Sequence, residues 1–230
     1  MGKKILTDKV EMEVYNQGID EAGRGCLVGP MFISLVVVQN RAVFDQLHLD
    51  DSKKFGSSLN GMKKRKVLYE EILTCCDVYI SEISSSRIDR EVICGAGLNV
   101  LERTGASALL SMVNTACNDK SLCMADGKNI FSPLSLTFSH VRSENKADSL
   151  YPATMAASIC AKHRRDLWVK KYYSSISKSI GYYPSGGGYV NQGTLQFINN
   201  YKELTGAYPV HMRKSWKLKK YSGEQLSFDF

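Results

Sequence analysis

Two adjacent carboxylates occupy the most distinctive point of the sequence. Asp20 and Glu21 end an apolar segment, and glycines follow them at once in the stretch GIDEAGRGCLVGP over residues 18–30. Neighbouring strand residues point to opposite faces, so both acids can serve one site only where the strand twists or ends. Gly23 and Gly25 permit such a turn and let backbone amides approach a phosphate or sugar. The acid pair alone would fit a solvated turn, but the whole segment favours a functional site.

Two further acids lie at positions where α/β proteins often have catalytic or binding residues. Asp126 ends a short apolar segment and precedes a glycine, and Asp148 comes just before a segment that begins at Pro152. Functional groups commonly lie at strand ends, although Asp148 would also suit a helix N-terminus as a simple dipole partner. With Asp20 and Glu21 these residues could form a cluster of four carboxylates. Its repulsion would be relieved by hard divalent cations, Mg²⁺ or Mn²⁺.

Hydrophobic periodicity predicts the elements that must position these acids. The predicted strands are 13–19, 30–38, 78–83, 122–125 and 136–141. The predicted helices are 62–73, 97–117, 152–172 and a last one from Asn191 or Thr194 to Leu204, closed by Gly206. This mixture predicts an α/β fold in which helices flank a mixed sheet, with a helical C-terminal region.

Two of these helices have a predicted inward face. For the helix at 62–73 the inward residues are Val67, Leu68, Ile72 and Leu73. For the helix at 97–117 they are Leu98, Leu101, Ala108, Met112 and Ala116. Apolar residues at this spacing are typical of helices packed on a core.

The formal net charge of +7 favours a polyanionic partner. Basic residues gather in three groups, at 53–66, 162–171 and 213–220. One such group is usually a solvated face, but three in a chain with an acidic motif predict a surface that follows nucleic-acid phosphates. The seven cysteines include no C-x-x-C pair, and no apolar run is long enough to span a bilayer. We therefore expect a cytoplasmic protein with reduced thiols and no membrane partner.

Several motifs resemble those of ribonuclease HII, the type-2 ribonuclease H family. The segment around Asp20 resembles the family signature, DSKK at 51–54 resembles its D-S-K-K segment, and Asp126-Gly127 its short acidic strand end. The blocks KADS at 146–149, AASICAK at 156–162, RD at 165–166 and RKSW at 213–216 resemble further family segments. The resemblance runs in order from about Gly18 to Lys217.

The resemblance implies a ribonuclease H-like sheet and specific roles for the acids and the glycines. Asp20, Glu21, Asp126 and Asp148 fall on the family's metal-binding catalytic acids. The segment Gly23–Gly25, with Arg24 between the glycines, falls on the backbone motif that reads a ribonucleotide 2′-hydroxyl.

The resemblance also implies substrate contacts away from the acids. A tyrosine in a late G-Y segment stacks on the junction sugar in this family; Tyr189 is our choice, and Tyr183 is a competing candidate. Arg24, Lys53 and Lys162 are candidates for phosphate charge compensation, and surface or capping roles are equally open for each.

The implied activity is hydrolysis of the RNA strand of RNA–DNA hybrids and cleavage 5′ of ribonucleotides embedded in duplex DNA. Catalysis with two Mg²⁺ or Mn²⁺ ions would leave a 5′-phosphate and a 3′-hydroxyl. One alternative is another nuclease or integrase with a similar sheet, which would cut all-DNA junctions. A second is a catalytically silent hybrid-binding module that recruits a clamp. Four retained acids argue against that module, because clustered negative charge opposes phosphate binding.

We expect one catalytic domain over 1–212, including the helical C-terminal part, followed by a basic tail over 213–230. The tail ends in QLSFDF, which resembles a sliding-clamp-binding peptide with Gln225, Phe228 and Phe230 as the contact residues. A final strand, or a tail packed on its own domain, is an equal alternative. No feature requires an oligomer, so we expect a monomer.

Overall fold

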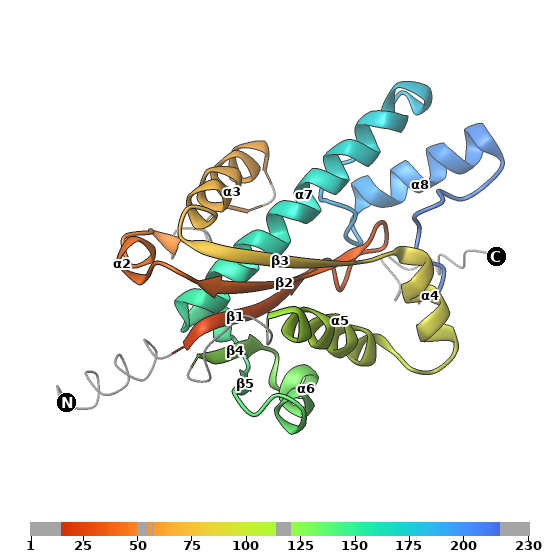
Figure 1. The fold of residues 1–230 in the computed structure, drawn as a ribbon. Coiled ribbons are helices and arrows are strands. Elements are labelled where there is room, and N and C mark those ends of the chain that lie inside the picture. The colour runs from red at the N-terminus through yellow and green to blue at the C-terminus, as the bar shows by residue number, and fades with distance from the viewer. Residues whose placement is uncertain (1–14, 50–54, 57, 114–120, 217–230) are drawn as a thin grey trace, which may run out of the picture.

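A mixed five-stranded sheet forms the centre of the structure (Figure 1). The computed structural model describes residues 15–49, 55–56, 58–113 and 121–216. The strand order is β3-β2-β1-β4-β5; the first three strands run antiparallel, and β4 and β5 continue parallel to β1. The strands are β1 (Tyr15–Ala22), β2 (Met31–Val38), β3 (Cys76–Ile83), β4 (Leu122–Asp126) and β5 (Val141–Glu144).

Helices cover both faces of this sheet (Figure 1). On one face α5 (Leu98–Val113) packs on β2 and β3, and its Leu109 shares a core with Ile33. On the other face α7 (Pro152–Ile180) crosses β1 and β2, and α3 (Leu59–Ile72) packs beside it around Val36. Because side chains alternate along a strand, β2 supplies apolar residues to both cores. This double burial explains its nearly continuous apolar sequence.

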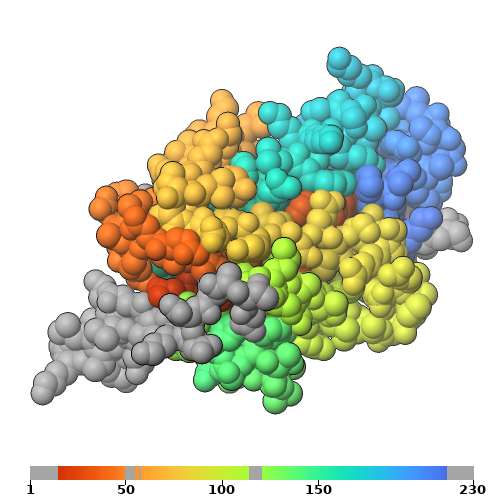
Figure 2. Space-filling view, viewed as in Figure 1, coloured from red at the N-terminus to blue at the C-terminus, as the bar shows by residue number. Residues whose placement is uncertain are grey.

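The central strand β1 is almost completely covered by its neighbours. In the space-filling view its red colour shows through only in small areas (Figure 2). Residues Gln17 to Asp20 are all buried. The strand that carries the first two predicted acids therefore lies inside the domain rather than at an edge.

Gly18 allows α7 to approach β1 very closely. A Cβ atom at this position would lie 2.2 Å from the Ala153 carbonyl carbon and from the Thr154 nitrogen. The Thr154 hydroxyl also donates a hydrogen bond of 2.9 Å to the Met124 carbonyl of β4. The beginning of α7 is thus held against the two strands that end in acids.

The C-terminal region is helical, as predicted. α8 (Gln192–Thr205) packs against the second half of α7, where the Phe197 and Tyr173 ring centroids are 5.0 Å apart (Figure 1). Asn191 is the N-cap, since its Oδ1 accepts a hydrogen bond of 2.9 Å from the Thr194 nitrogen. Gly206, with φ 73°, ends the helix.

Short elements complete the described chain. They are α2 (Arg41–Phe44), α4 (Ser85–Ile93), α6 (Lys128–Phe131), η2 (Ser132–Leu136) and η3 (Ala147–Ser149). Among all helices of the described residues, none is long and apolar enough to cross a membrane. The six cysteines among the described residues are all free.

The predicted α/β class with a mixed sheet is confirmed, but some of the predicted boundaries were wrong. The strand expected at 136–141 is absent: η2 ends at Leu136 and β5 begins only at Val141. Pro133 fixes a helical φ at the start of η2, which local apolar patterning did not reveal. The helix expected to end at Tyr172 continues to Ile180, because no breaker precedes Gly181.

The inward faces of two helices were also partly wrong. In α3, Leu68 and Ile72 are buried as predicted, whereas Val67 and Leu73 are 53% and 48% exposed. In α5, Leu101 is buried as predicted, whereas Met112 is 60% exposed and Ala108 is also exposed. The buried stripe of α5 lies about one position away from the predicted one, along Leu101, Gly105, Ala106, Leu109, Leu110 and Val113. Ala116 lies outside the described residues.

Candidate functional site

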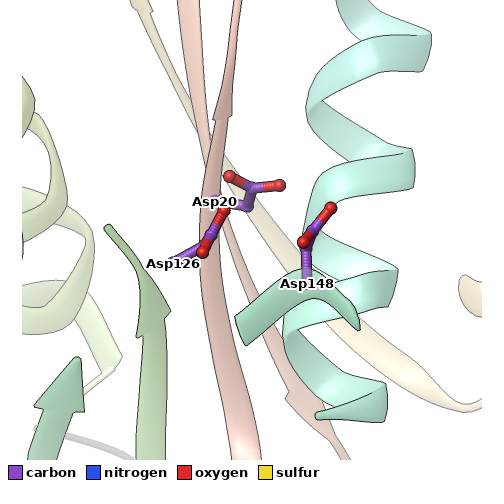
Figure 3. A group of neighbouring side chains, drawn as sticks. All are labelled: Asp20, Asp126 and Asp148. Atoms are coloured by element: carbon purple, nitrogen blue, oxygen red, sulfur yellow. The ribbon is translucent and has the colours of Figure 1, made fainter. Parts of the chain in front are cut away.

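Three aspartates from distant parts of the chain meet at one end of the sheet. Asp20 of β1, Asp126 at the end of β4 and Asp148 in η3 each offer a carboxylate oxygen, and these oxygens lie within 4.8 Å of one another (Figure 3). Asp20 is buried, and the other two are half-buried. The structure thus brings together three of the four acids selected from the sequence.

The strand pairing and one side-chain hydrogen bond explain this convergence. β1 and β4 run parallel with Ile19 opposite Ala125, so the following residues, Asp20 and Asp126, lie side by side. The Asp126 Oδ1 atom accepts a hydrogen bond of 2.8 Å from the Ala147 nitrogen, which ties η3 to the end of β4. Asp148 is the next residue, and it therefore faces the other two carboxylates.

Burial and nearby negative charge raise the pKa of two of these carboxylates, Asp20 and Asp126. Burial, followed by the charge of Glu21, raises the pKa of Asp20 well above its usual value, while Ser158 and Lys162 act in the opposite direction. The pKa of Asp126 is raised mainly by burial and also by Asp148, although the Ala147 amide opposes the shift. Converging hard oxygen donors with unrelieved negative charge fit a divalent cation such as Mg²⁺ or Mn²⁺.

Glu21 lies beside this group but is not one of its three members. Its backbone nitrogen donates a hydrogen bond of 2.7 Å to the Asp20 Oδ1 atom. Burial raises the pKa of Glu21 to about 7, with a further contribution from the charge of Glu102. The alternation along β1 explains the separation, because adjacent side chains start from opposite faces.

Two buried arginines hold the glycine-rich loop that follows the acids. Arg213 is fully buried and donates to the carbonyls of Gly23 (2.7 Å), Arg24 (2.8 Å) and Gly29 (2.9 Å). Arg165 donates to the carbonyls of Pro30 (2.6 Å), Val28 (2.9 Å) and Gly187 (2.7 Å). The carbonyl side of the loop is therefore bound to the protein interior.

These contacts change the interpretation of the basic groups seen in the sequence. Arg65, Arg165 and Arg213, one from each group, are buried rather than solvated. Arg65 pairs with Asp166 at 2.7 Å, and the other two bind backbone carbonyls. Lys162 is exposed, its Nζ atom donates a hydrogen bond of 2.8 Å to Ser158 Oγ, and its charge opposes the rise in the pKa of Asp20 and Asp126.

The Arg24 side chain turns toward α5, and its predicted contact with a phosphate stays a prediction. Its Nη1 atom pairs with the Glu102 carboxylate, and its Nη2 atom donates a hydrogen bond of 2.7 Å to Asn99 Oδ1. Sequence reasoning missed both partners. The available signal was an acid among the apolar residues of the inward face of this helix, since Glu102 is followed by Ala106 and Leu109 on the same face.

Tyr189 lies next to the glycine-rich loop, whereas Tyr183 packs elsewhere. Tyr189 pairs with Cys26 in an isolated β-bridge, and its ring centroid is 5.8 Å from the Arg165 guanidinium. It lines a pocket of about 250 Å³ together with residues such as Lys162. The Tyr183 ring instead packs edge-on against Tyr173 at 6.0 Å.

The remaining predicted contact residues belong to two segments outside the described part of the chain. Lys53 and the rest of the DSKK segment lie outside the described residues, and so do Gln225, Phe228 and Phe230 of the tail. Arg213 and Met212, at the predicted boundary between domain and tail, are both buried in the domain.

Comparisons with known proteins identify relatives over most of the chain. The family model described as Ribonuclease HII matches residues 17–219. A ribonuclease HII of Thermococcus sibiricus is 33% identical over 222 residues, covering 91% of this chain and 91% of the relative. A ribonuclease HII of Thermococcus kodakarensis is 31% identical over 219 residues, covering 91% and 90%.

Solved structures of similar proteins share the fold. Ribonuclease H2 from Pyrococcus horikoshii matches with a TM-score of 0.70 and 25% identity, over 87% of this chain and 93% of that chain. The PCNA:RNase HII complex from Archaeoglobus fulgidus contains a chain with the same TM-score, identity and coverage. The acidic group, the order of the motifs and these matches lead to one conclusion: the chain belongs to the ribonuclease HII family, whose members are metal-dependent ribonucleases H.

Proposed function

We propose that this protein hydrolyses the RNA strand of RNA–DNA hybrids and also cuts 5′ of ribonucleotides embedded in duplex DNA. The observation that carries the proposal is the convergence of Asp20, Asp126 and Asp148 within 4.8 Å, beside a glycine-rich loop. The family supplies the reaction class, and the loop supplies a means of distinguishing RNA from DNA.

The acids act by holding cations at the scissile phosphate. Asp20, Asp126 and Asp148 supply carboxylate oxygens that converge on one point. The neighbouring carboxylate of Glu21 adds negative charge beside Asp20. Two bound Mg²⁺ or Mn²⁺ ions would activate the attacking water and stabilise the leaving 3′-oxygen, so that the products are a 5′-phosphate and a 3′-hydroxyl. Lys162 would compensate phosphate charge, because it lines the same pocket as Tyr189 and its charge acts on both Asp20 and Asp126.

The loop at Gly23–Gly25 would recognise the ribonucleotide through its backbone. Its carbonyls bind Arg213, and Gly25 is exposed with no atom within 4 Å of where a Cβ would stand. A backbone so exposed can approach a sugar closely, and the 2′-hydroxyl is the group that distinguishes RNA from DNA. Tyr189 would stack on the junction sugar from the neighbouring pocket.

A cleavage assay tests this proposal directly. The substrates are a duplex with one embedded ribonucleotide, a long RNA–DNA hybrid and an all-DNA duplex, each with Mg²⁺, Mn²⁺ or a chelator. We expect cation-dependent cutting of the first two and no cutting of the third. Cutting of the all-DNA duplex would favour a nuclease of different specificity. Tight hybrid binding without cleavage would favour the silent binding module.

We also propose that the C-terminal tail binds a sliding clamp. The relative from Archaeoglobus fulgidus was solved in a complex named PCNA:RNase HII, and this chain ends in a sequence of the clamp-binding type. Deletion of residues 225–230 should abolish retention on an immobilised clamp and leave cleavage of a short duplex unchanged. Equal retention of the deleted and full chains would contradict this part of the proposal.

A further inference from the structure

Glu102 lies buried between the sheet and α5, next to the glycine-rich loop. Its side chain is fully buried, and within the described part of the chain its Oε1 atom has no hydrogen-bond partner. The Oε2 atom pairs with Arg24 Nη1. A buried carboxylate that loses its ion-pair partner is strongly destabilised, so the Glu102 conformation depends on Arg24, and Arg24 is in turn constrained by Glu102.

The Arg24 side chain is attached to α5 at two points. Besides Glu102, it donates a hydrogen bond of 2.7 Å to Asn99 Oδ1, one helical turn earlier. Asn99 and Glu102 are three residues apart and therefore occupy the same side of the helix. A planar guanidinium with two acceptors from one helix has a defined orientation, in contrast to a side chain that reaches into solvent for a phosphate.

The backbone of the same loop is bound by the buried side chain of Arg213. That guanidinium binds the carbonyls of Gly23 and Arg24 at 2.7 and 2.8 Å. Arg24 is thus restrained through both its carbonyl and its guanidinium, whereas the next residue, Gly25, is exposed to open space. The exposed peptide of the loop therefore follows a residue that is restrained at two points.

We propose that Glu102, assisted by Asn99, is a positioning residue for ribonucleotide recognition: it fixes Arg24 and thereby orients the Gly23–Gly25 backbone toward the sugar. This inference rests on the proposed function, because it assumes that the loop binds the 2′-hydroxyl. It assigns to Arg24 a role in shaping the loop and none in binding a phosphate. Glu102 does not contact the substrate in this proposal.

The test uses Glu102→Gln, which preserves the shape of the side chain and removes its charge. Asn99→Ala, at an exposed position, is a second variant that does not disturb the core. The matched control is Glu70→Gln, which removes one carboxylate from an exposed pair with Lys66. Each variant of the full chain is assayed on the duplex with one embedded ribonucleotide, and its binding to an all-DNA duplex is measured separately.

We expect Glu102→Gln to raise KM about tenfold, the scale of a lost hydrogen bond to a charged group, with a smaller change in kcat. Asn99→Ala should have the same pattern with a smaller effect. Binding to all-DNA duplex should not change, and Glu70→Gln should behave as wild type. In an Arg24→Ala background the effect of Glu102→Gln should disappear, since both substitutions break the same contact.

Three results would overturn the inference. One is an unchanged KM in both Glu102→Gln and Asn99→Ala. Another is additivity of the Glu102 and Arg24 substitutions. The third is tighter binding of Glu102→Gln to all-DNA duplex, which would mean that the released Arg24 binds phosphate. Failure of the proposed function is a separate result, because wild-type protein would then not cut the ribonucleotide-containing duplex at all.

Discussion

The acidic group and the glycine-rich loop are adjacent, yet they differ in how their charged side chains are compensated. Asp20, Asp126 and Asp148 converge with their negative charge largely unrelieved, and burial raises the pKa of the first two. In the loop, the guanidiniums of Arg165 and Arg213 are buried and donate hydrogen bonds to backbone carbonyls. The acidic group therefore requires cations from outside, whereas the loop is bound by cationic side chains of the protein itself. This contrast suggests that the loop is rigid before substrate binds, while the acids gain their working arrangement with the cations.

The largest expected effect comes from removing one carboxylate from the acidic group. Asp20→Asn should lower the single-turnover cleavage rate at least about a thousandfold, because charge stabilisation by bound metal contributes several kcal/mol to the transition state. Hybrid binding, measured by fluorescence anisotropy, should persist. Unchanged turnover in this variant would refute the assignment of the acids.

The next effect concerns the interior of the loop. Arg213→Met should lower the free energy of unfolding by about 3 kcal/mol or more, because three buried carbonyls lose their donor. Urea denaturation measures the loss. Lys214→Met at the neighbouring exposed position should change stability by less than about 0.5 kcal/mol. Equal stability of the two variants would show that the carbonyl contacts contribute little.

Two glycines of the loop should respond differently to alanine. Gly23 has a φ of 91°, and a Cβ there would lie 2.8 Å from the Pro30 carbonyl oxygen, so Gly23→Ala should cost about 1–2 kcal/mol or more. Gly25→Ala faces open space and should fold as wild type. If the loop contacts the sugar, Gly25→Ala should nevertheless raise KM. A wild-type KM for a folded Gly25→Ala protein would argue against that contact.

The pH dependence of the metal-free protein gives a separate test of the acidic group. Burial raises the pKa of Glu21 from 4.5 to about 7, so the folded state binds the proton more tightly than the unfolded state. Stability should therefore be full below pH 4.5 with respect to this group and fall as the pH rises toward 7. Thermal melts with a chelator measure the fall, and Mg²⁺ should reduce it. A rise in stability over the same interval would contradict the predicted direction.

The chemistry of the site was predictable because its residues sit in short, distinctive segments. Asp20 and Glu21 are marked by the glycines after them, and Asp126 by its place at the end of an apolar run. Their convergence required knowledge of strand order, since only the parallel pairing of β1 with β4 sets Asp20 beside Asp126. Helix boundaries and inward faces were predicted less well, because packing of α3 and α5 decides which apolar residues remain exposed.

The roles of the charged residues around the acids could not be predicted in the same way. Arg165 and Arg213 stand within basic groups and look like surface residues, yet both are buried and bind carbonyls more than 100 positions away. Glu102 belongs to no recognisable motif. Its structural role depends on its ion pair with Arg24, which lies 78 residues earlier in the chain. Nothing in local sequence distinguishes a lysine or arginine that faces solvent from one that reaches inward.

By itself, the sequence determined which side chains could bind cations and which backbone could approach a sugar, because residue type alone sets those capacities. The tertiary structure decided which of these groups meet and how each charge is compensated. Distance and burial govern electrostatic energy, and both depend on contacts between segments far apart in the chain.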